Sequence, residues 1–366
     1  MASIRKYDTA RGHAWRVQYR SPDGKSRTKQ GFRTKAEAQA WADANAVAVR
    51  TGDWIDPNAG KMTVCELGAA WLAMQTHLKP KTLYTTEQVW RNHVQPAWAA
   101  RKVASILPSE VQEWVASFTQ GASLVRQAHA MLAQILDVAV MDGRLKANPA
   151  RGVRLPAKAR AAKVYLSAEQ LATLAGECSK RQELVWLLGT AGLRWGEAAA
   201  LRVKDVNVVR GRVSVERNAV TIGSRVEIGT PKTHERRSVA VPRAVIRMLE
   251  PAMEGKLPEA LLWARADGSP LRLPSHGDWY YRALDRCMAR DESFPRVTPH
   301  GLRHVAAGLM VSAGANVKVV QRNLGHASAA MTLDVYADLF DEDLDGVAVA
   351  MDEKISGVVD LSWKRA

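Results

Sequence analysis

The chain has 366 residues, enough for two or three domains, and 47% of them are hydrophobic, which excludes a disordered protein. Lysine and arginine total 52 against 37 aspartate and glutamate residues, which gives a formal net charge of +15. A chain this basic most often binds a polyanion, and nucleic acid is the leading candidate, although a basic surface can also serve solubility alone. No apolar run approaches the roughly 18 residues of a membrane span, so we expect no membrane partner.

The three cysteines, Cys65, Cys178 and Cys287, lie far apart and match no metal-ligand spacing. We expect reduced thiols, as in proteins of the cytoplasm. The first residues, MASIRKYDTA, lack the apolar stretch of a secretory signal. Both observations predict a cytoplasmic location.

Residues 1–35 contain ten lysines and arginines and only two acidic residues. The stretch AWRVQYR, 14–20, alternates as a half-buried strand does, and the turn SPDG leads into a second strand over about 25–32. The capping-box pattern TKAE at 34–37 then opens a helix. A sheet with a basic face and a covering helix predicts a DNA-binding domain over 1–55, with a structural appendage as the alternative. Its candidate DNA contacts are Arg16, Arg20, Lys25, Arg27 and Lys29.

A linker at 56–61 separates this domain from a helical region over 62–148. Four stretches of that region have apolar residues three and four positions apart, which predicts an all-α bundle of about four helices. A second linker, 149–163, contains two prolines and several basic residues. In this linker Lys158 and Arg160 are candidate contacts to a phosphate backbone, and a merely solvated linker is the alternative.

The third predicted domain, 164–366, begins with the capping-box pattern SAEQ and is mainly helical. Three short alternating runs, at 212–217, 225–229 and 236–242, predict a small antiparallel sheet. The expected fold class is therefore α+β and multidomain. It comprises a small N-terminal three-stranded sheet plus helix, an all-α bundle, and a mainly α domain with a small antiparallel sheet.

Two polar positions stand out in the apolar stretch GTAGLRWGEAAALRV, where Arg194 and Glu197 lie three residues apart. On a helix this spacing lets Glu197 hold the arginine in position, although a plain intrahelical ion pair of small energy fits as well. The stretch TPKTHERRSV places Lys232 in a turn between two predicted strands. A lysine in a turn indicates nothing by itself.

The stretch TPHGLRHVAAGLM is more specific, because His300 and Arg303 bring an imidazole and a guanidinium to one face at a helix start. His304 follows His300 by four residues, a spacing that two metal ligands can have. No glutamate follows His300 as in zinc proteases, and no acidic third ligand is near. We therefore expect no metal site.

His326 follows a glycine in LGHAS, and Tyr336 lies ten residues further on. Val335, Tyr336, Leu339 and Phe340 have helical spacing, so the plain interpretation of the tyrosine is an aromatic residue in a buried stripe. The next 17 residues are acidic in balance and contain no lysine or arginine. A bound DNA is therefore expected to end near this tyrosine.

Together these residues suit the attack of a tyrosine on a phosphodiester without a metal ion. Its transition state spreads negative charge over the non-bridging oxygens, and two guanidinium groups can neutralise that charge because each forks onto phosphate oxygens. The tyrosine hydroxyl can attack phosphorus, and a histidine can take or orient its proton. A lysine in a β-turn can protonate the leaving 5′-oxygen.

The sequence resembles the tyrosine recombinases, the phage integrase family, over nearly its whole length. The stretches GLRWGE, TPKTHERRSV, HGLRH, LGH and TLDVY match the motifs of that family in order and spacing. By resemblance, the catalytic set, which Glu197 supports, is Arg194, Lys232, His300, Arg303, His326 and Tyr336.

The resemblance implies a site-specific recombinase that integrates a phage or mobile element, with excision as a further reaction. Tyr336 is expected to form a 3′-phosphotyrosyl link and to release a 5′-hydroxyl, and no cofactor is needed because the ester keeps the bond energy. Its ring is expected to be only partly buried. The implied partners are double-stranded DNA at core-type and arm-type sites and a homotetramer, with an excisionase and a DNA-bending host factor as candidates. The implied location is the host cytoplasm, at the nucleoid.

Residues 62–148 resemble the core-binding domain of this family, and residues 1–55 resemble its arm-binding domain. The alternatives are a Xer-like resolvase, a type IB topoisomerase-like enzyme that relaxes DNA, and an inactive DNA-binding regulator. An arm-like domain speaks against the first two, and the complete polar set speaks against the third. The acidic tail resembles tails that dock on a neighbouring subunit, with packing on its own domain as the alternative, and GVVDLSW at 357–363 is expected to form a strand.

Overall fold

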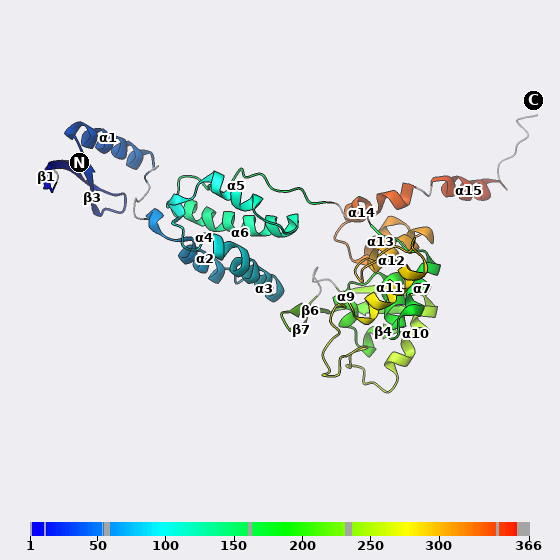
Figure 1. The fold of residues 1–366 in the computed structure, drawn as a ribbon. Helices are drawn as coiled ribbons and strands as arrows, with labels where there is room; N and C mark the ends of the chain where they lie inside the picture. The colour runs from blue at the N-terminus through cyan, green and yellow to red at the C-terminus, as the bar shows by residue number, and fades with distance from the viewer. Residues whose placement is uncertain are drawn as a thin grey trace, which may run out of the picture. The chain divides into compact units, whose positions relative to one another are not determined.

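The computed structural model describes residues 2–10, 12–52, 54, 59–159, 163–230, 236–341 and 344–356. The chain divides into two compact units, Met1–Arg160 and Ala161–Ala366, and each is described by itself. Figure 1 labels the helices and strands along the chain.

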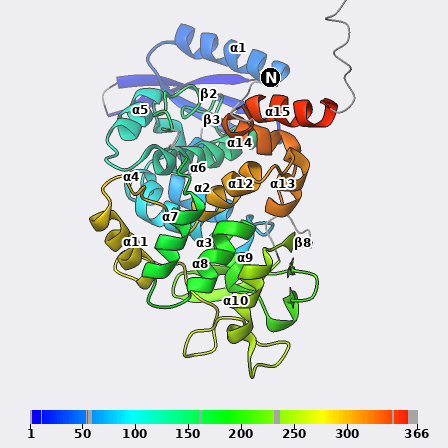
Figure 2. The ribbon, with the colours of Figure 1, turned by 90° about the vertical axis from the view of Figure 1, so that its right-hand side faces the viewer.

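The first unit begins with an antiparallel sheet in the order β1-β2-β3. Its elements are β1 (Ser3–Thr9), β2 (Gly12–Arg20) and β3 (Ser26–Phe32), followed by helix α1 (Lys35–Thr51). The helix covers one face of the sheet (Figure 2), where Ala38 and Ala42 pack against Val17. Because alternate residues of a strand point to opposite faces, Arg16 and Arg20 of β2 stay exposed on the other face. The predicted sheet with its covering helix is confirmed.

A helical bundle follows in the same unit. Its elements are α2 (Val64–Ala73), α3 (Pro80–Val89), a π-helical turn (Trp90–Val94), α4 (Gln95–Trp98), α5 (Pro108–Ala116) and α6 (Ala122–Met141), with 3-10 turns at Ala59–Lys61 and Val103–Ser105. Leu132 and Leu136 of α6 are fully buried in the core of the bundle. Pro96 has no N–H, and its ring would collide with the carbonyl four residues back, so the helix widens into the π turn just before it. The predicted helical stretches are all present, the second of them divided.

The second unit is mainly helical. Its helices are α7 (Ala168–Glu177), α8 (Gln182–Ala191), α9 (Trp195–Ala199), a 3-10 turn (Val203–Asp205), α10 (Arg243–Met253), α11 (Trp279–Arg290), α12 (Leu302–Ser312), α13 (Val317–Leu324), α14 (Ala329–Asp341) and α15 (Leu344–Ile355). The capping box predicted for α7 is present: the Ser167 hydroxyl accepts from the Gln170 backbone N–H, and the Gln170 side chain accepts from the Ser167 N–H.

In the described part of this unit, five short strands form two separate antiparallel groups. They are β4 (Val206–Asn207), β5 (Arg212–Val215), β6 (Asn218–Ile222), β7 (Arg225–Gly229) and β8 (Arg237–Ala240). The sheet has the order β4-β5-β8, whereas β7 pairs with β6 across the two-residue turn Gly223–Ser224. The run at 225–229 therefore belongs to its own hairpin and not to the predicted sheet, because alternation reveals a strand but not its partner.

Helix α8 is central to the second unit and packs against α7, α10 and α12. Its residues Leu184, Leu187 and Leu188 are buried in the main core. A smaller cluster joins α12, α13 and α14 around Leu324 and Tyr336. The C-terminus of α8, the start of α12 and the C-terminus of α13 thereby come together. In the part of the chain that the structure describes, every helix is too short or too polar to cross a membrane.

Candidate active site

Arg303 lies in the first turn of α12 and is only 4% exposed. Its guanidinium donates hydrogen bonds to the carbonyl oxygens of Gly192 (2.7 Å) and Leu324 (2.6 Å), where α8 and α13 end. Gly192 and Gly325 adopt left-handed backbone conformations there, with φ of 69° and 66°. Helix C-termini carry partial negative charge, which stabilises the buried cation. Burial, and next the charge of Arg194, lowers the pKa of Arg303 to about 10, so it remains charged at neutral pH.

Glu197 links two arginines from different elements. It is 1% exposed, and its carboxylate accepts hydrogen bonds from the guanidinium (2.8 Å) and the backbone N–H (2.9 Å) of Arg194, the N-cap of α9. It accepts two more, at 3.0 and 2.7 Å, from Arg237 of β8. Burial alone would raise the pKa of Glu197, but Arg237 and then Arg194 outweigh it and hold the pKa below its ordinary 4.5. The contact predicted between Glu197 and Arg194 is present, and Arg237 is a third member that the sequence reasoning missed.

Tyr336 interrupts the helical geometry of α14, with φ −128° and ψ 17°. Its side chain is 1% exposed and packs with Ala307, Val311 and Val320. The expectation of a partly exposed ring is therefore wrong, because α12 and α13 cover it. Burial raises the pKa of Tyr336 to about 12, although the nearby charge of Arg303 opposes the rise. The hydroxyl is thus protonated at neutral pH and needs both a base and a positive field to become a nucleophile.

His304 contacts this hydroxyl directly, with 2.9 Å between its Nδ1 and the Tyr336 Oη. In the sequence, His304 stands out only as a possible metal ligand. Its position four residues after His300 gave a signal, since both side chains project from one face at the start of α12. Burial lowers the pKa of His304, and His300, Arg303 and Lys163 lower it further, so its imidazole is neutral at physiological pH.

His326 lies against the same tyrosine. The two ring centroids are 6.2 Å apart and the ring planes differ by 9°. The Nδ1 of His326 is 3.0 Å from the hydroxyl of Thr332. Burial, then Arg303 and Arg194, lowers the pKa of His326 to about 4. His300, in the turn before α12, also has a lowered pKa, with burial as the largest cause.

Lys163, at the beginning of the second unit, holds the backbone beside the nucleophile. Its ammonium donates a hydrogen bond to the carbonyl of Val335 and lies 5.9 Å from the ring centroid of Tyr336. No spacing rule indicated this contact, because the two residues are 172 positions apart. It adds a positive charge close to the tyrosine.

Several predicted features lie outside the described residues. Lys232 is one of them, although the strands on both sides of it, β7 and β8, are described. Arg160 of the second linker and the strand expected at 357–363 are others. The same is true of the side chains of Leu339 and Phe340, which were expected to anchor α14.

The predicted DNA contacts of the first unit differ in whether their side chains are bound to other residues of the protein or exposed. Arg27 is used within the sheet module, since its Nε donates to the Ser21 hydroxyl at 3.0 Å and its guanidinium lies 5.5 Å from the Trp54 ring centroid. The other candidates have exposed side chains: Arg16, Arg20, Lys25, Lys29 and, in the linker, Lys158.

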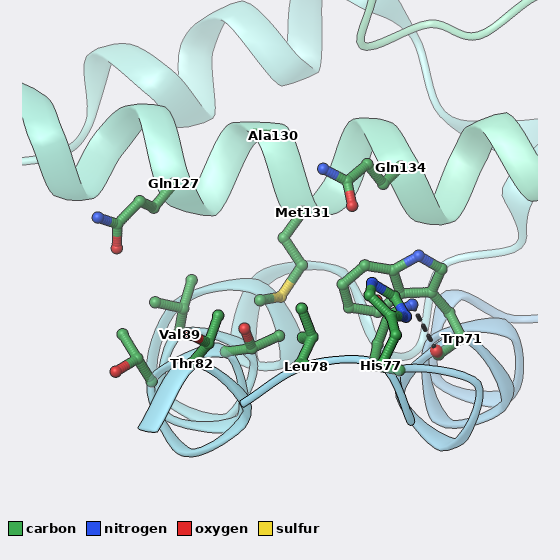
Figure 3. Close-up of a pocket in the computed structure, with 12 residues that line it drawn as sticks. Trp71, His77, Leu78, Thr82, Val89, Gln127, Ala130, Met131 and Gln134 are labelled. Atoms are coloured by element: carbon green, nitrogen blue, oxygen red, sulfur yellow. Dashed lines mark hydrogen bonds between the residues drawn. The ribbon is translucent and has the colours of Figure 1, made fainter. Parts of the chain in front are cut away.

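A groove of about 420 Å³ lies between α3 and α6 of the first unit. Figure 3 shows Met131 pointing from α6 towards α3, with Gln127 and Gln134 on either side of it. The residues that line the groove include no lysine, arginine, aspartate or glutamate. Its hydroxyl and amide groups come from Thr82, Thr85, Thr86, Gln75, Gln127 and Gln134.

The second unit therefore surrounds a neutral phenol with fixed positive charge and neutral imidazoles. Arg194 and Arg303 are held by a carboxylate and by carbonyls, so their orientation exists before any ligand binds. Such an arrangement can receive a phosphodiester and stabilise the charge of its transition state. Within the described ranges, no three histidine, cysteine, aspartate or glutamate side chains are grouped to hold a metal ion.

Three family models match separate parts of the chain. Residues 165–343 match the phage integrase family, residues 3–44 match an arm DNA-binding domain, and residues 63–118 match the N-terminal SAM-like domain of phage integrases. The three matched regions follow one another in the order of the units and modules described above.

Two relatives from mycobacterial phages match most of the chain. The integrase of Mycobacterium phage D29 is 29% identical over 323 residues, which are 83% of this chain and 84% of the relative. The integrase of Mycobacterium phage FRAT1 is 28% identical over 315 residues, 81% of this chain and 92% of the relative.

Solved structures show the same fold. The Tn1549 transposon integrase in complex with a circular intermediate DNA has a TM-score of 0.66 at 21% identity, over 75% of this chain and 94% of that one. A lambda integrase tetramer bound to a Holliday junction has a TM-score of 0.56 at 16% identity, over 88% of this chain and 96% of that one.

Proposed function

The chain belongs to the phage integrase family of tyrosine recombinases, and from this premise we propose that it cleaves and rejoins DNA through a 3′-phosphotyrosyl link to Tyr336. One observation carries the assignment of the residues. Segments that are far apart in the sequence bring the Arg303 guanidinium and the imidazoles of His304 and His326 to the Tyr336 side chain. The charge of Arg194 acts on both His326 and Arg303.

The scissile phosphate is received by Arg194 and Arg303. The contacts described above use one N–H of Arg194's guanidinium and two of Arg303's, and each guanidinium has five. The remaining donors stabilise the charge that develops on the non-bridging oxygens as Oη attacks phosphorus. Lys232 protonates the leaving 5′-oxygen, a role that follows from its motif. The ester keeps the energy of the broken bond, so the reverse attack by a 5′-hydroxyl rejoins a strand without a cofactor.

The first unit binds the DNA through two of its parts. Residues 1–55 bind arm-type sites through the exposed basic face of β2, and residues 62–148 bind the core-type site. The groove between α3 and α6 supports the second assignment, because glutamine and threonine side chains without net charge can read base edges in the major groove. The linker 149–163 follows the phosphate backbone with Lys158 and Arg160.

Strand exchange requires four copies of the chain on two duplexes. Helix α15 supports assembly, since Val349, Met351 and Ile355 expose apolar side chains that a neighbouring subunit can cover. Acidic residues outnumber basic ones in the described part of this C-terminal segment, so its charge suits a protein partner better than DNA. An excisionase and a DNA-bending host factor set the direction of the reaction, which takes place at the nucleoid in the host cytoplasm.

Covalent attachment tests this proposal. A binding duplex is isolated from a random-sequence pool with the full chain and given a nick near each candidate cleavage position; we call it the selected duplex. The wild-type chain is expected to form a protease-sensitive adduct on a denaturing gel, whereas Tyr336→Phe binds the duplex with unchanged affinity and forms no adduct. An adduct with the phenylalanine variant would exclude Tyr336 as the nucleophile. Relaxation of a supercoiled plasmid without strand exchange would indicate a topoisomerase instead.

A further inference from the structure

We propose that Arg237 is a positioning residue for the reaction, which holds the guanidiniums of Arg194 and Arg303 in the orientation that receives the scissile phosphate. Arg237 does not bind the phosphate itself. The proposal rests on the proposed function and adds to it a residue outside the six motif positions. No motif distinguishes Arg237 from its neighbour Arg236, whose side chain is 79% exposed.

The first contact of Arg237 is with the carboxylate that holds Arg194. Its Nη1 and Nη2 donate to the two carboxylate oxygens of Glu197, at 3.0 and 2.7 Å. The guanidinium and the backbone N–H of Arg194 donate to the same two oxygens. A carboxylate that accepts both bonds of a planar fork is fixed in its rotation. The orientation that Glu197 imposes on Arg194 therefore depends on Arg237.

The second contact of Arg237 is with the end of α13. Its Nε donates to the carbonyl of Asn323 at 3.2 Å, and the next carbonyl, that of Leu324, accepts from Arg303. Gly325 allows this close approach, because a Cβ at that position would lie 2.9 Å from the Cδ and the Nε of Arg237. Arg237 thus fixes the segment that supplies one of the two carbonyls holding Arg303.

The two arginines that share Glu197 differ in what their guanidiniums can still bind. The Arg194 side chain is 26% exposed, and its described contact with the carboxylate uses only Nη1. The Arg237 side chain is 11% exposed, and all three of its nitrogens donate to Glu197 or Asn323. Arg194 can therefore turn its other nitrogens to a phosphate, whereas the nitrogens of Arg237 are bound within the protein.

Arg237 also keeps a net positive charge at the site. The pKa of Glu197 lies below its ordinary 4.5, so this side chain is a carboxylate at neutral pH. Facing Arg194 alone, it would leave the pair without net charge, whereas with Arg237 one positive charge remains. Burial and then the charge of Arg194 lower the pKa of Arg303, and the charge of Arg237 lowers it further. The field of Arg237 therefore reaches the second guanidinium as well.

The test compares a charged with a neutral phosphorus centre. The selected duplex carries, at the cleavage position mapped by adduct formation, either the natural phosphate or a methylphosphonate, in which a methyl group replaces one non-bridging oxygen and removes the negative charge. Single-turnover strand cleavage by the full chain is measured on both. We expect Arg237→Gln to cleave the natural phosphate about 10²–10³-fold more slowly than the wild type, with duplex affinity within about twofold. On the methylphosphonate the loss should shrink to less than about tenfold, because a neutral centre depends less on oriented guanidiniums.

Two further variants separate charge from geometry. Arg237→Lys keeps the positive charge but cannot donate to both oxygens of Glu197 and to the Asn323 carbonyl as the planar fork does. We expect it to cleave the natural phosphate about tenfold more slowly than the wild type, with a smaller loss on the methylphosphonate. Arg286→Gln is the matched control, because Arg286 pairs with Glu177 at 2.8 Å but is 46% exposed. It should keep the wild-type rate on both duplexes.

Three results would overturn the role of Arg237. One is a wild-type rate for Arg237→Gln on the natural phosphate, and another is an equal loss on the two duplexes, since a general disturbance of the fold slows both reactions alike. The third is a wild-type rate for Arg237→Lys, which would mean that charge alone suffices. If Arg237→Gln lacks a thermal unfolding transition, Arg237→Lys decides by the same comparison of the two duplexes.

A double variant decides if the wild type does not cleave the methylphosphonate. On the natural phosphate, the loss for Arg194→Gln/Arg237→Gln should be at least tenfold smaller than the product of the two single losses, because Arg237 acts through Arg194. A loss equal to that product overturns the proposal. Failure of the proposed function is distinguishable, because then the wild type forms no adduct on the natural phosphate or Tyr336→Phe forms one.

Discussion

Arginine has opposite surroundings in two regions of this molecule. In the N-terminal sheet, Arg16 and Arg20 extend from one face of β2 into solvent. In the second unit, Arg303 is buried, and Arg237 and Arg194 share one buried carboxylate. Exposed guanidiniums attract the phosphate backbone over a distance and tolerate changes of position. Buried and fixed guanidiniums cannot follow a ligand, so they stabilise only the geometry for which they are arranged. In the function that we propose, the same side chain therefore supplies affinity for DNA in one region and catalysis in the other.

The largest effect that this comparison predicts is on cleavage. Arg303→Lys keeps a positive charge but cannot donate to the carbonyls of Gly192 and Leu324 and to a phosphate at the same time. We expect single-turnover adduct formation on the selected duplex to fall about 10³-fold, with DNA affinity within about twofold of wild type. A loss smaller than tenfold would mean that fixing this guanidinium contributes little.

The next effect concerns stability. Glu197→Gln leaves Arg194 and Arg237 without their shared negative charge, so we expect the free energy of unfolding to fall by about 3 kcal/mol in a denaturant titration. Glu177→Gln is the matched control, because Glu177 also pairs with two arginines, Arg286 and Arg290, but these are largely exposed. Its loss should stay below about 1 kcal/mol. Equal losses for the two variants would remove the distinction between buried and exposed pairs.

We expect low pH to lower the stability of the protein through the same carboxylate, that of Glu197. The folded-state pKa of Glu197 lies below 4.5, so its contribution to stability is complete above pH 4.5 and is lost as the pH falls through the folded-state value. We therefore expect wild-type stability to decline below pH 4.5 more steeply than that of Glu197→Gln. Parallel curves for the two proteins in urea titrations at several pH values would contradict this expectation.

The groove between α3 and α6 differs from both arginine regions, because its polar groups come mainly from threonine and glutamine side chains among apolar ones. We expect Gln127→Ala or Gln134→Ala to alter the bases preferred in a repeated selection, at a cost of about 1–3 kcal/mol for the original base pair. The dependence of affinity on salt should not change. A weaker salt dependence with unchanged base preference would show that these glutamines only approach the backbone.

The smallest effect on stability is expected in the sheet. Arg16→Ala, Arg20→Ala and Lys29→Ala should each change the free energy of unfolding by less than about 0.5 kcal/mol, because these side chains are exposed. Each should nevertheless lower the slope of log affinity against log salt by about 1 on DNA that contains an arm-type site. Arg27→Ala offers a contrast, since its contacts with Ser21 and Trp54 predict a larger loss of stability.

Much of the fold could be predicted from the sequence because it depends on local patterns. The alternation in β2, the caps of α7 and the apolar spacing of α6 each involve residues within a few positions of one another. The pairing of β7 with β6 could not be predicted in this way. Many strands have the same alternation of residues, and the turn and the packing determine which of them pair.

The sequence by itself determined which residue types the site contains and in what order, through motifs that carry Arg194, Arg303, His326 and Tyr336. Apart from the contact of Arg194 with Glu197, only the tertiary structure decided what each of them touches. It buried Tyr336 and placed His304 at its hydroxyl. It also brought Arg237 to Glu197 and Lys163 to the backbone of Val335. The physical reason is the separation of the contacting residues along the sequence. The spacing of residue types predicts contacts only within one or two helical turns. These partners are 32 to 172 positions apart and meet only when the helices pack.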